Sequence, residues 1–314
     1  MLATRDAFGL QLVESAKENE NIIALSADLA KATRLSKFQQ QIPDRFFEVG
    51  IAECNMIGLG SGLSEYGYKV FMASFASFLT GKYDVIRVSI CYAGAPVVLV
   101  GTHAGMAIGK DGVTQMGLED ISLMRSLPNM SVVNPATYSE AIEVVKYLCE
   151  SDIEGPHYLR LGRQPIEDVL KEHYTNAKFE FGKAITVRAG RDVTIFSTGC
   201  TLPDVLEAAR KIEEESHQTV RVVNIHTIKP IDKEAIIECA KETSHLFSVE
   251  DHTILGGLGT SISEVLTELY PKRLVRIGLN DEFPESAPPS DLYEKYGLSA
   301  SQITARVLNE VLDK

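Results

Sequence analysis

The sequence lacks a long apolar run, an excess of positive charge and a membrane-targeting start. No stretch approaches the roughly 18 consecutive apolar residues that suggest a transmembrane helix. Residues 1–6 (MLATRD) lack the apolar core of a signal peptide. The formal net charge is −12, whereas nucleic-acid-binding proteins present a basic face. We therefore expect neither a membrane nor a nucleic acid as a partner.

Closely spaced cysteines are also missing. The five cysteines are odd in number, far apart and without a CxxC pair: Cys54, Cys91, Cys149, Cys200 and Cys239. This usage is typical of small buried thiols in a reducing compartment, with no zinc site and no disulfide framework. The sequence therefore predicts a cytoplasmic location.

Short apolar runs alternate with helical patterns along the 314 residues, a length that suggests about two domains. Strands are expected at 22–25, 46–49, 69–72, 96–100, 130–133 and 158–161, and again at 193–196, 220–223, 246–249 and 274–277. Such alternation predicts an α/β fold of two doubly wound domains with mainly parallel sheets. We place the domains at 1–163 and 184–314, joined by a polar linker at 164–183.

The sequence predicts where two of the helices begin. Thr4 is expected to cap a helix whose Phe8, Leu12 and Ala16 share one face. The glycine-rich stretch at 256–259 opens another helix. A phosphate loop there is disfavoured, because neither a P-loop nor a full GxGxxG is present. Close backbone packing is the preferred interpretation.

Glu53 lies between the strand expected at 46–49 and a segment of small residues, Gly58, Gly60, Ser61 and Gly62. Ile51, Ala52 and Met56 are its apolar neighbours in sequence. Burial among them would favour the neutral acid, raising the pKa by up to about 3–5 units, so that Glu53 could donate a proton. From these residues alone, a glutamate at a helix N-terminus is the simpler interpretation.

Two further motifs follow Glu53. Phe75 and Phe78 stand three residues apart, and the segment 101–117 contains five glycines around His103, Asp111 and Gln115. Loops longer than about 12–15 residues in a compact domain are usually functional or disordered. Together with Glu53, this order of motifs resembles the pyrimidine-binding domain of transketolases, which are thiamine diphosphate enzymes. Residues 184–314 resemble their C-terminal domain, so the resemblance covers the second half of a standard transketolase.

The resemblance implies roles at the cofactor. Glu53 matches the glutamate that hydrogen-bonds a ring nitrogen of the aminopyrimidine, a catalytic role. Phe78 matches the aromatic that stacks on that ring, with Phe75 beside it, and Gln115 matches a position near the cofactor. Without the resemblance, two rings three apart on a helix are more often part of a core.

The resemblance also implies a substrate site. His103 and Asp111 match the residues that hold the hydroxyls of the sugar, although a surface turn is an alternative for Asp111 alone. Arg5 and Arg163 match the arginines that bind the substrate phosphate, for which a planar guanidinium is well suited. A hydroxyl residue usually assists them, but Ala32 stands at that position, and Thr33 beside it is the candidate substitute.

The metal-binding half of such an enzyme is absent. The family binds Mg²⁺ or another divalent ion, and through it the diphosphate, by a Gly-Asp-Gly stretch and an Asn, yet this chain contains no Gly-Asp dipeptide. The resemblance therefore implies the C-terminal subunit of a split transketolase of the pentose phosphate pathway. An N-terminal subunit would carry the metal, and pairing of this chain with itself across a two-fold axis would give a heterotetramer. The reaction would be ketol transfer between phosphorylated sugars.

Other interpretations stay open. A 2-oxoacid dehydrogenase β subunit has the same two domains but is not expected to carry the His103, Asp111 and Gln115 series. Deoxyxylulose-phosphate synthase shares the fold and tends to have Arg where His103 stands. A non-catalytic assembly partner is disfavoured because Glu53 and His103 are both present. In the second half, Asp251 and His252 are adjacent; without a nucleophile, we interpret this pair as structural.

Overall fold

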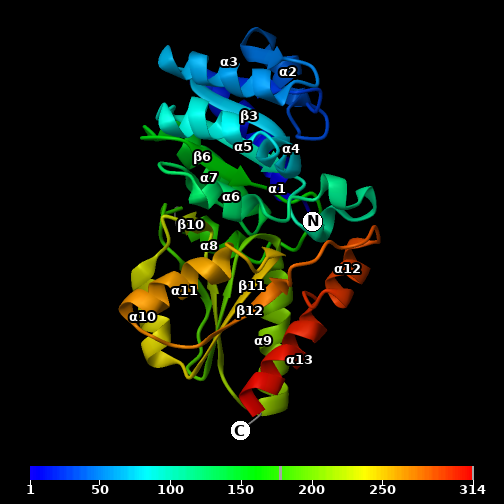
Figure 1. Cartoon of the computed structure of the whole chain (residues 1–314), viewed down its shortest axis with the longest axis vertical. Coiled ribbons are helices and arrows are strands. Elements are labelled where there is room, and N and C mark those ends of the chain that lie inside the picture. The colour runs from blue at the N-terminus through cyan, green and yellow to red at the C-terminus, as the bar shows by residue number, and fades with distance from the viewer. Residues whose placement is uncertain (177–178, 313–314) are drawn as a thin grey trace.

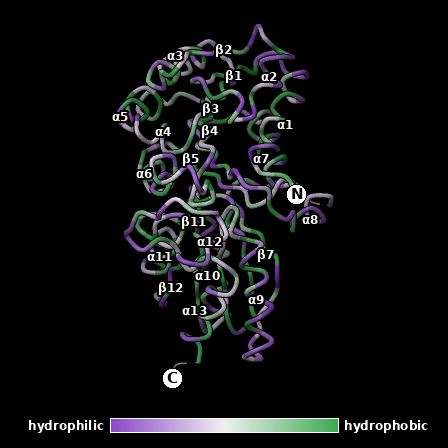
Figure 2. Tube along the Cα trace, turned by 90° about the vertical axis from the view of Figure 1, so that its right-hand side faces the viewer, coloured by the Kyte–Doolittle hydropathy of each residue, from purple (hydrophilic) through white to green (hydrophobic). Residues whose placement is uncertain are grey.

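Alternating strands and helices build two lobes stacked along the long axis of the molecule (Figure 1). The computed structural model describes residues 1–176 and 179–312. The N-terminus lies at the junction of the two lobes, and the C-terminus lies at the far end of the second lobe, in both views (Figures 1 and 2). The predicted α/β class with two mainly parallel sheets is confirmed.

The first lobe contains a seven-stranded sheet in the order β10-β5-β6-β4-β3-β1-β2. Its strands are β1 (Ile22–Ser26), β2 (Phe46–Glu48), β3 (Lys69–Phe75), β4 (Val97–Thr102), β5 (Ser131–Val133), β6 (His157–Arg160) and β10 (Thr227–Lys229). The pairs among β1 to β6 are parallel. Strand β10 comes from the second half of the sequence and pairs antiparallel with β5.

Helices cover both faces of this sheet. This half of the chain contains the helices α1 (Thr4–Glu18), α2 (Ser36–Gln41), α3 (Glu53–Glu65), α4 (Ala76–Thr80), α5 (Tyr83–Val85), α6 (Asp120–Ser126), α7 (Tyr138–Glu150) and α8 (Lys171–Asn176), and the short helical turns η1 (Pro43–Arg45), η2 (Ile86–Tyr92), η3 (Met106–Asp111) and η4 (Val113–Gln115). Successive strand residues point to opposite faces. Ile22 packs in one core with Phe8 of α1, and Ile23 in the other with Met56 of α3.

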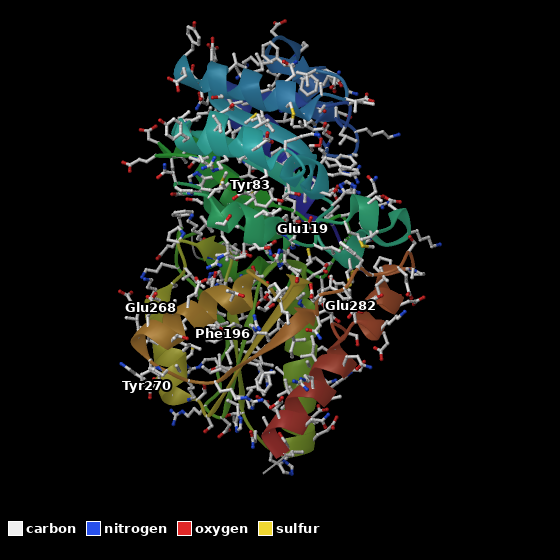
Figure 3. All side chains as sticks on the ribbon, viewed as in Figure 1. Tyr83, Glu119, Phe196, Glu268, Tyr270 and Glu282 are labelled. Carbon is white, nitrogen blue, oxygen red and sulfur yellow. The ribbon has the colours of Figure 1, made fainter. Side chains whose placement is uncertain are left out.

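The second lobe contains a five-stranded sheet in the order β12-β11-β8-β9-β7, in which β7 is antiparallel. Its elements are β7 (Ile185–Arg188), β8 (Val193–Ser197), η5 (Gly199–Thr201), α9 (Leu202–Ser216), β9 (Val220–Asn224), α10 (Lys233–Glu242), β11 (His245–Thr253), α11 (Leu258–Leu269), β12 (Leu274–Leu279), α12 (Pro289–Lys295) and α13 (Ala300–Leu312). Ile195 faces α9 and α13, while the neighbouring Phe196 packs in the core with α10 and α11 (Figure 3).

Some local predictions were wrong. The apolar run at 46–49 is typical of a buried strand, but β2 is an edge strand paired with β1, and its Phe47 is 37% exposed. Thr4 is the first residue of α1 and not its cap; its hydroxyl accepts a hydrogen bond from the Gly162 amide at 2.8 Å. Cys54 is an exposed thiol, although buried thiols were expected.

Strands β7 and β10 were not anticipated, and the expected linker contains helix α8, with residues 177–178 outside the described part. No described helix is long and apolar enough to cross a bilayer.

Candidate active site

Glu53 is the first residue of α3 and is 9% exposed. Its negative charge is favourable at a helix N-terminus. Among the described residues, none donates a hydrogen bond to its carboxylate. The expected apolar surroundings are only partly present, because Met56 is buried but Ile51 is 83% exposed. Glu53 is therefore shielded from most solvent while its carboxylate stays available to a ligand.

Phe75 and Phe78 do not share a helix, so the alternative of two core rings on one helix does not apply. Phe75 ends strand β3 and Phe78 lies in α4, with their ring centroids 5.1 Å apart. Phe75 also stacks on the His103 ring at a centroid distance of 3.8 Å. Phe75 is consequently covered on both sides, and Phe78, which is half-buried, is the ring with free surface for a ligand.

His103 follows strand β4 directly and is 3% exposed. Its Nε2 lies 2.8 Å from Nη1 of Arg5, and its Nδ1 lies 2.9 Å from the Thr102 hydroxyl, which donates to the Ser74 carbonyl. Because a guanidinium can only donate, Nε2 accepts and the ring proton belongs on Nδ1. Burial, followed by the charge of Arg5, lowers the pKa of His103 to about 3, so the ring is neutral near pH 7.

Arg5 lies in the first turn of α1 and donates to the Ala32 carbonyl at 2.9 Å as well as to His103. Burial, with the charge of Arg34 as the next cause, lowers the pKa of Arg5 to about 10. Its Nε is buried and has no hydrogen-bond partner in the described chain. An unpaired buried donor on a cation is costly, and an anionic ligand would satisfy it.

Thr33 is placed differently from the expected phosphate ligand. Its side chain is fully buried, and its hydroxyl donates to the Leu29 carbonyl at 2.9 Å. In this conformation Thr33 cannot reach a ligand, and the neighbouring Ala32 carbonyl is already bound to Arg5.

Arg163 and Asp111 form an ion pair at 2.6 Å. Nη1 of Arg163 also donates to the Ile108 carbonyl at 3.0 Å, so both contacts come from η3. Gln115 lies in η4 and is half-buried; its carbonyl accepts from Ser77 of α4 at 3.1 Å. The fold thus places each candidate phosphate ligand beside a candidate sugar ligand: Arg5 lies beside His103, and Arg163 beside Asp111. No contact joins Glu53 to these groups within the described residues.

Sequence reasoning missed the part that Asp251 plays at this site. Its carboxylate accepts from the Met106 amide at 2.8 Å, from the Ala107 amide at 3.4 Å and from the Tyr293 hydroxyl at 2.8 Å. Asp251 therefore contacts the start of η3, the element that carries Asp111. A buried carboxylate at the end of a strand was the available signal, but the Met106 amide that it binds lies 145 residues away.

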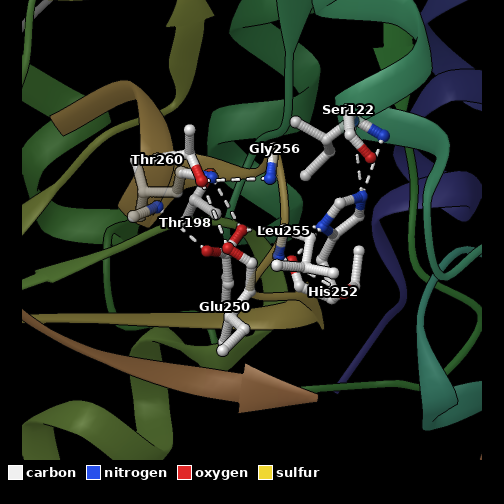
Figure 4. A network of polar contacts seen from close by, with 12 residues as sticks. Ser122, Thr198, Glu250, His252, Leu255, Gly256 and Thr260 are labelled. Carbon is white, nitrogen blue, oxygen red and sulfur yellow. Dashed lines mark hydrogen bonds and ion pairs between the residues drawn. The ribbon is translucent and has the colours of Figure 1, made fainter. Parts of the chain in front are cut away.

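The neighbouring His252 and Glu250 bind helix N-termini. His252 Nε2 accepts from the Ile121 amide of α6 at 3.2 Å, and its Nδ1 donates to its neighbour's carbonyl. The Glu250 carboxylate accepts from the Leu258 and Gly259 amides at 2.7 and 2.9 Å (Figure 4). The glycine-rich start of α11 therefore holds the chain's own carboxylate, which agrees with close packing rather than a phosphate site.

Comparison with known proteins places this geometry in a family. The family model described as transketolase, pyrimidine binding domain matches residues 1–167, and that of the transketolase C-terminal domain matches residues 182–303. The chain belongs to the transketolase family.

The relatives of this transketolase-family chain include half-length proteins. It is 38% identical to a protein of Methanocaldococcus jannaschii named as a transketolase C-terminal section, over 98% of this chain and 96% of the relative. It is 37% identical to the 6-deoxy-6-sulfo-D-fructose transketolase subunit SqwH of Clostridium sp. strain MSTE9, over 99% and 94%. A solved structure described as a split gene transketolase, inactive beta4 tetramer, superposes with a TM-score of 0.90 at 42% identity, covering 100% of this chain and 99% of that one.

A 1-deoxy-D-xylulose-5-phosphate synthase of Clostridium perfringens (strain SM101) is 34% identical over 94% of this chain, which spans 47% of that relative. The relatives of this chain therefore carry the names of more than one kind of enzyme.

Proposed function

We propose that this chain is the C-terminal subunit of a split, thiamine diphosphate-dependent transketolase that transfers a two-carbon ketol unit between phosphorylated sugars. The observation that carries the proposal is the meeting of four distant side chains in two pairs, Arg5 with His103 and Arg163 with Asp111. Two guanidinium groups supply charge for a phosphate. The imidazole and the carboxylate supply acceptors for sugar hydroxyls.

Glu53 and Phe78 fit the pyrimidine end of the cofactor. The Glu53 carboxylate has no protein donor among the described residues, so a ring nitrogen of the aminopyrimidine can share a proton with it. Phe78 offers its free face for stacking on the ring. When bound, thiamine diphosphate supplies the nucleophilic carbon of the reaction. His103, neutral with Nε2 as acceptor, can bind a sugar hydroxyl once Arg5 turns to the phosphate.

The diphosphate end requires a second subunit. The chain has no Gly-Asp dipeptide, and its described residues contain no group of three or more His, Cys, Asp or Glu that could hold a metal ion. We therefore assign Mg²⁺ or another divalent ion to an N-terminal partner subunit. The split-gene relative of known structure is an inactive tetramer of β chains. That relative supports both partner dependence and self-association for this chain, here within a cytoplasmic heterotetramer.

His103 favours a transketolase over deoxyxylulose-phosphate synthase, which tends to have Arg at this position. One relative is named as a 6-deoxy-6-sulfo-D-fructose transketolase subunit, so the support for a phosphate group comes from this chain's own arginines. Arg5 and Arg163 come from opposite ends of the first lobe's sequence, yet the charge of Arg163 contributes to lowering the pKa of Arg5. Two neighbouring guanidinium groups suit a phosphate dianion.

Reconstitution tests the proposal. This chain should show no ketol transfer by itself, because the cofactor's diphosphate and reactive carbon are not positioned. Activity from a phosphorylated ketose to an aldose phosphate should appear when a chain with the Gly-Asp-Gly and Asn pattern is added. Calorimetry of the isolated chain with thiamine diphosphate and Mg²⁺ should show no binding. Tight binding, or ketol transfer without a partner, would overturn the split-enzyme proposal.

A further inference from the structure

The second lobe contacts the glycine-rich segment through one buried carboxylate. Asp251 lies in β11 and is 5% exposed. Its Oδ1 accepts from the Met106 amide and its Oδ2 from the Ala107 amide, so the carboxylate binds the first two residues of η3. Tyr293 of α12 donates its hydroxyl to the same Oδ2 at 2.8 Å. We refer to these two side chains as the Asp251–Tyr293 pair.

The sequence of the segment is adapted to this contact. Gly105 has a φ of +77°, in the left-handed region that favours glycine. A Cβ added at Gly105 would lie 2.1 Å from Oδ2 of Asp251. Any other residue would thus displace the carboxylate from the amides that it binds.

The C-terminal end of the segment, at Gly117, is also linked to Asp251. Nη2 of the buried Arg160 donates both to the Gly117 carbonyl at 3.1 Å and to the backbone carbonyl of Asp251 at 2.9 Å. Between the two ends, the apolar side chains of Met106, Ile108 and Met116 belong to the core of the second lobe. The second lobe therefore binds the start of the segment through Asp251, packs against its apolar side chains, and is linked to its far end through Arg160 of β6.

The segment in turn sets the geometry of the substrate candidates. Helical turn η3 ends at Asp111, whose carboxylate binds Arg163, and it presents the Ile108 carbonyl to the same guanidinium. The Ala107 carbonyl accepts from the Gln164 side chain at 2.9 Å. A shift of η3 would therefore move Asp111 and Arg163 together.

We propose that the Asp251–Tyr293 pair is a positioning unit through which the C-terminal domain sets the Asp111–Arg163 pair for sugar-phosphate binding. The proposal has two halves. The structural half, that Asp251 fixes the position of η3, is independent of the proposed function. The substrate half, that this position matters for sugar-phosphate binding, rests on the proposed function. Asp251 is a positioning residue, because no substrate group is expected to touch it.

Amide hydrogen exchange on the full chain tests the structural half. Asp251→Asn removes the charge and leaves one acceptor atom for three donors, so the Met106 and Ala107 amides should exchange at least about tenfold faster. The matched control is Glu250→Gln, since Glu250 is an equally buried carboxylate that binds two helix amides inside the second lobe. Exchange at Met106 and Ala107 should not change in that variant.

Kinetics of the enzyme reconstituted with its partner subunit test the substrate half. Asp251→Asn should raise the KM for a ketose phosphate by about tenfold, with half-saturation by thiamine diphosphate unchanged. Tyr293→Phe removes one hydroxyl and should give a smaller change in the same direction. It also serves as the test if Asp251→Asn fails to fold.

The outcomes separate the two proposals. Unchanged exchange at Met106 and Ala107 in a folded Asp251→Asn or Tyr293→Phe chain overturns the positioning role. Equal acceleration in Glu250→Gln overturns it too, because the effect would then be general destabilisation. An unchanged KM in an active variant overturns the substrate half. If the amides exchange faster in the variant but the reconstituted wild-type enzyme shows no ketol transfer, the proposed function is wrong and the control of η3 by Asp251 is still supported.

Discussion

Glu53 is the residue on which the proposed chemistry depends most. Its neutral analogue, Glu53→Gln, cannot exchange a proton with the cofactor's ring nitrogen, and losing such a group lowers rates by about 10²–10⁴-fold. We expect the kcat of the reconstituted enzyme to fall by that amount at saturating cofactor. Glu65→Gln is the matched control, since Glu65 is an exposed carboxylate at the other end of α3. A near wild-type kcat in Glu53→Gln would contradict the assignment.

The sequence predicted the placement of some candidate residues better than that of others. His103 and Arg5 do meet, and it was the resemblance to transketolases that brought both into the candidate set. Thr33 was chosen because of its neighbour's missing hydroxyl, but the turn that buries its side chain directs its hydroxyl to Leu29. Side-chain direction within a turn depends on backbone angles that no residue type specifies.

Helix α3 contains glycines of two kinds. Gly60 is buried, and an added Cβ would lie 2.2 Å from Sδ of Met72, whereas Gly58 and Gly62 are exposed with open space around them. Of the small residues at 58–62, only Gly58 and Gly62 thus remain on an open face, because Ser61 also donates its hydroxyl to the Ser89 carbonyl.

Alanine substitutions in α3 should therefore have opposite effects. Gly58→Ala should raise the free energy of unfolding of the isolated chain by about 0.5–1 kcal/mol, the helix-propensity gain. Gly60→Ala should lower it by about 1–3 kcal/mol through overpacking. Thermal unfolding measures both effects. If the exposed face binds another protomer, Gly58→Ala should also weaken assembly in sedimentation experiments. Unchanged assembly would rule this face out as a contact.

Apolar strands were the most predictable elements, since burial on both faces gives them continuous apolar runs. Strand β10 was missed because Thr227–Lys229 is short and carries a polar residue at each end. The segment 101–117 was identified as functional by its glycines, but its packing was not foreseen. Its partner Asp251 is distant in sequence, as is Tyr293, which binds Asp251 in turn.

At the scale of the whole molecule, Glu140 joins the two lobes. Its carboxylate accepts from the Ala136 amide at 2.6 Å, from the Tyr174 hydroxyl at 2.8 Å and from Asn224 of the second lobe at 2.7 Å. In the sequence, Glu140 is an ordinary acidic residue in the first turn of a helix, so only the folded arrangement shows this role. Burial raises the pKa of Glu140 from 4.5 to about 7.

This pKa shift predicts how stability depends on pH. Because the folded pKa lies above the unfolded one, the folded state binds more protons between pH 4.5 and 7, and its stability falls as pH rises through that window. Glu140→Gln carries no such titration. The loss in free energy of unfolding between pH 5 and 8 should therefore be smaller in Glu140→Gln than in the wild type, by on the order of 2–3 kcal/mol.

Denaturant titrations at a series of pH values measure this difference, with the exposed Glu150→Gln on the same helix as the control. Parallel pH profiles for wild type and Glu140→Gln would show that Glu140 titrates alike in the folded and unfolded chains.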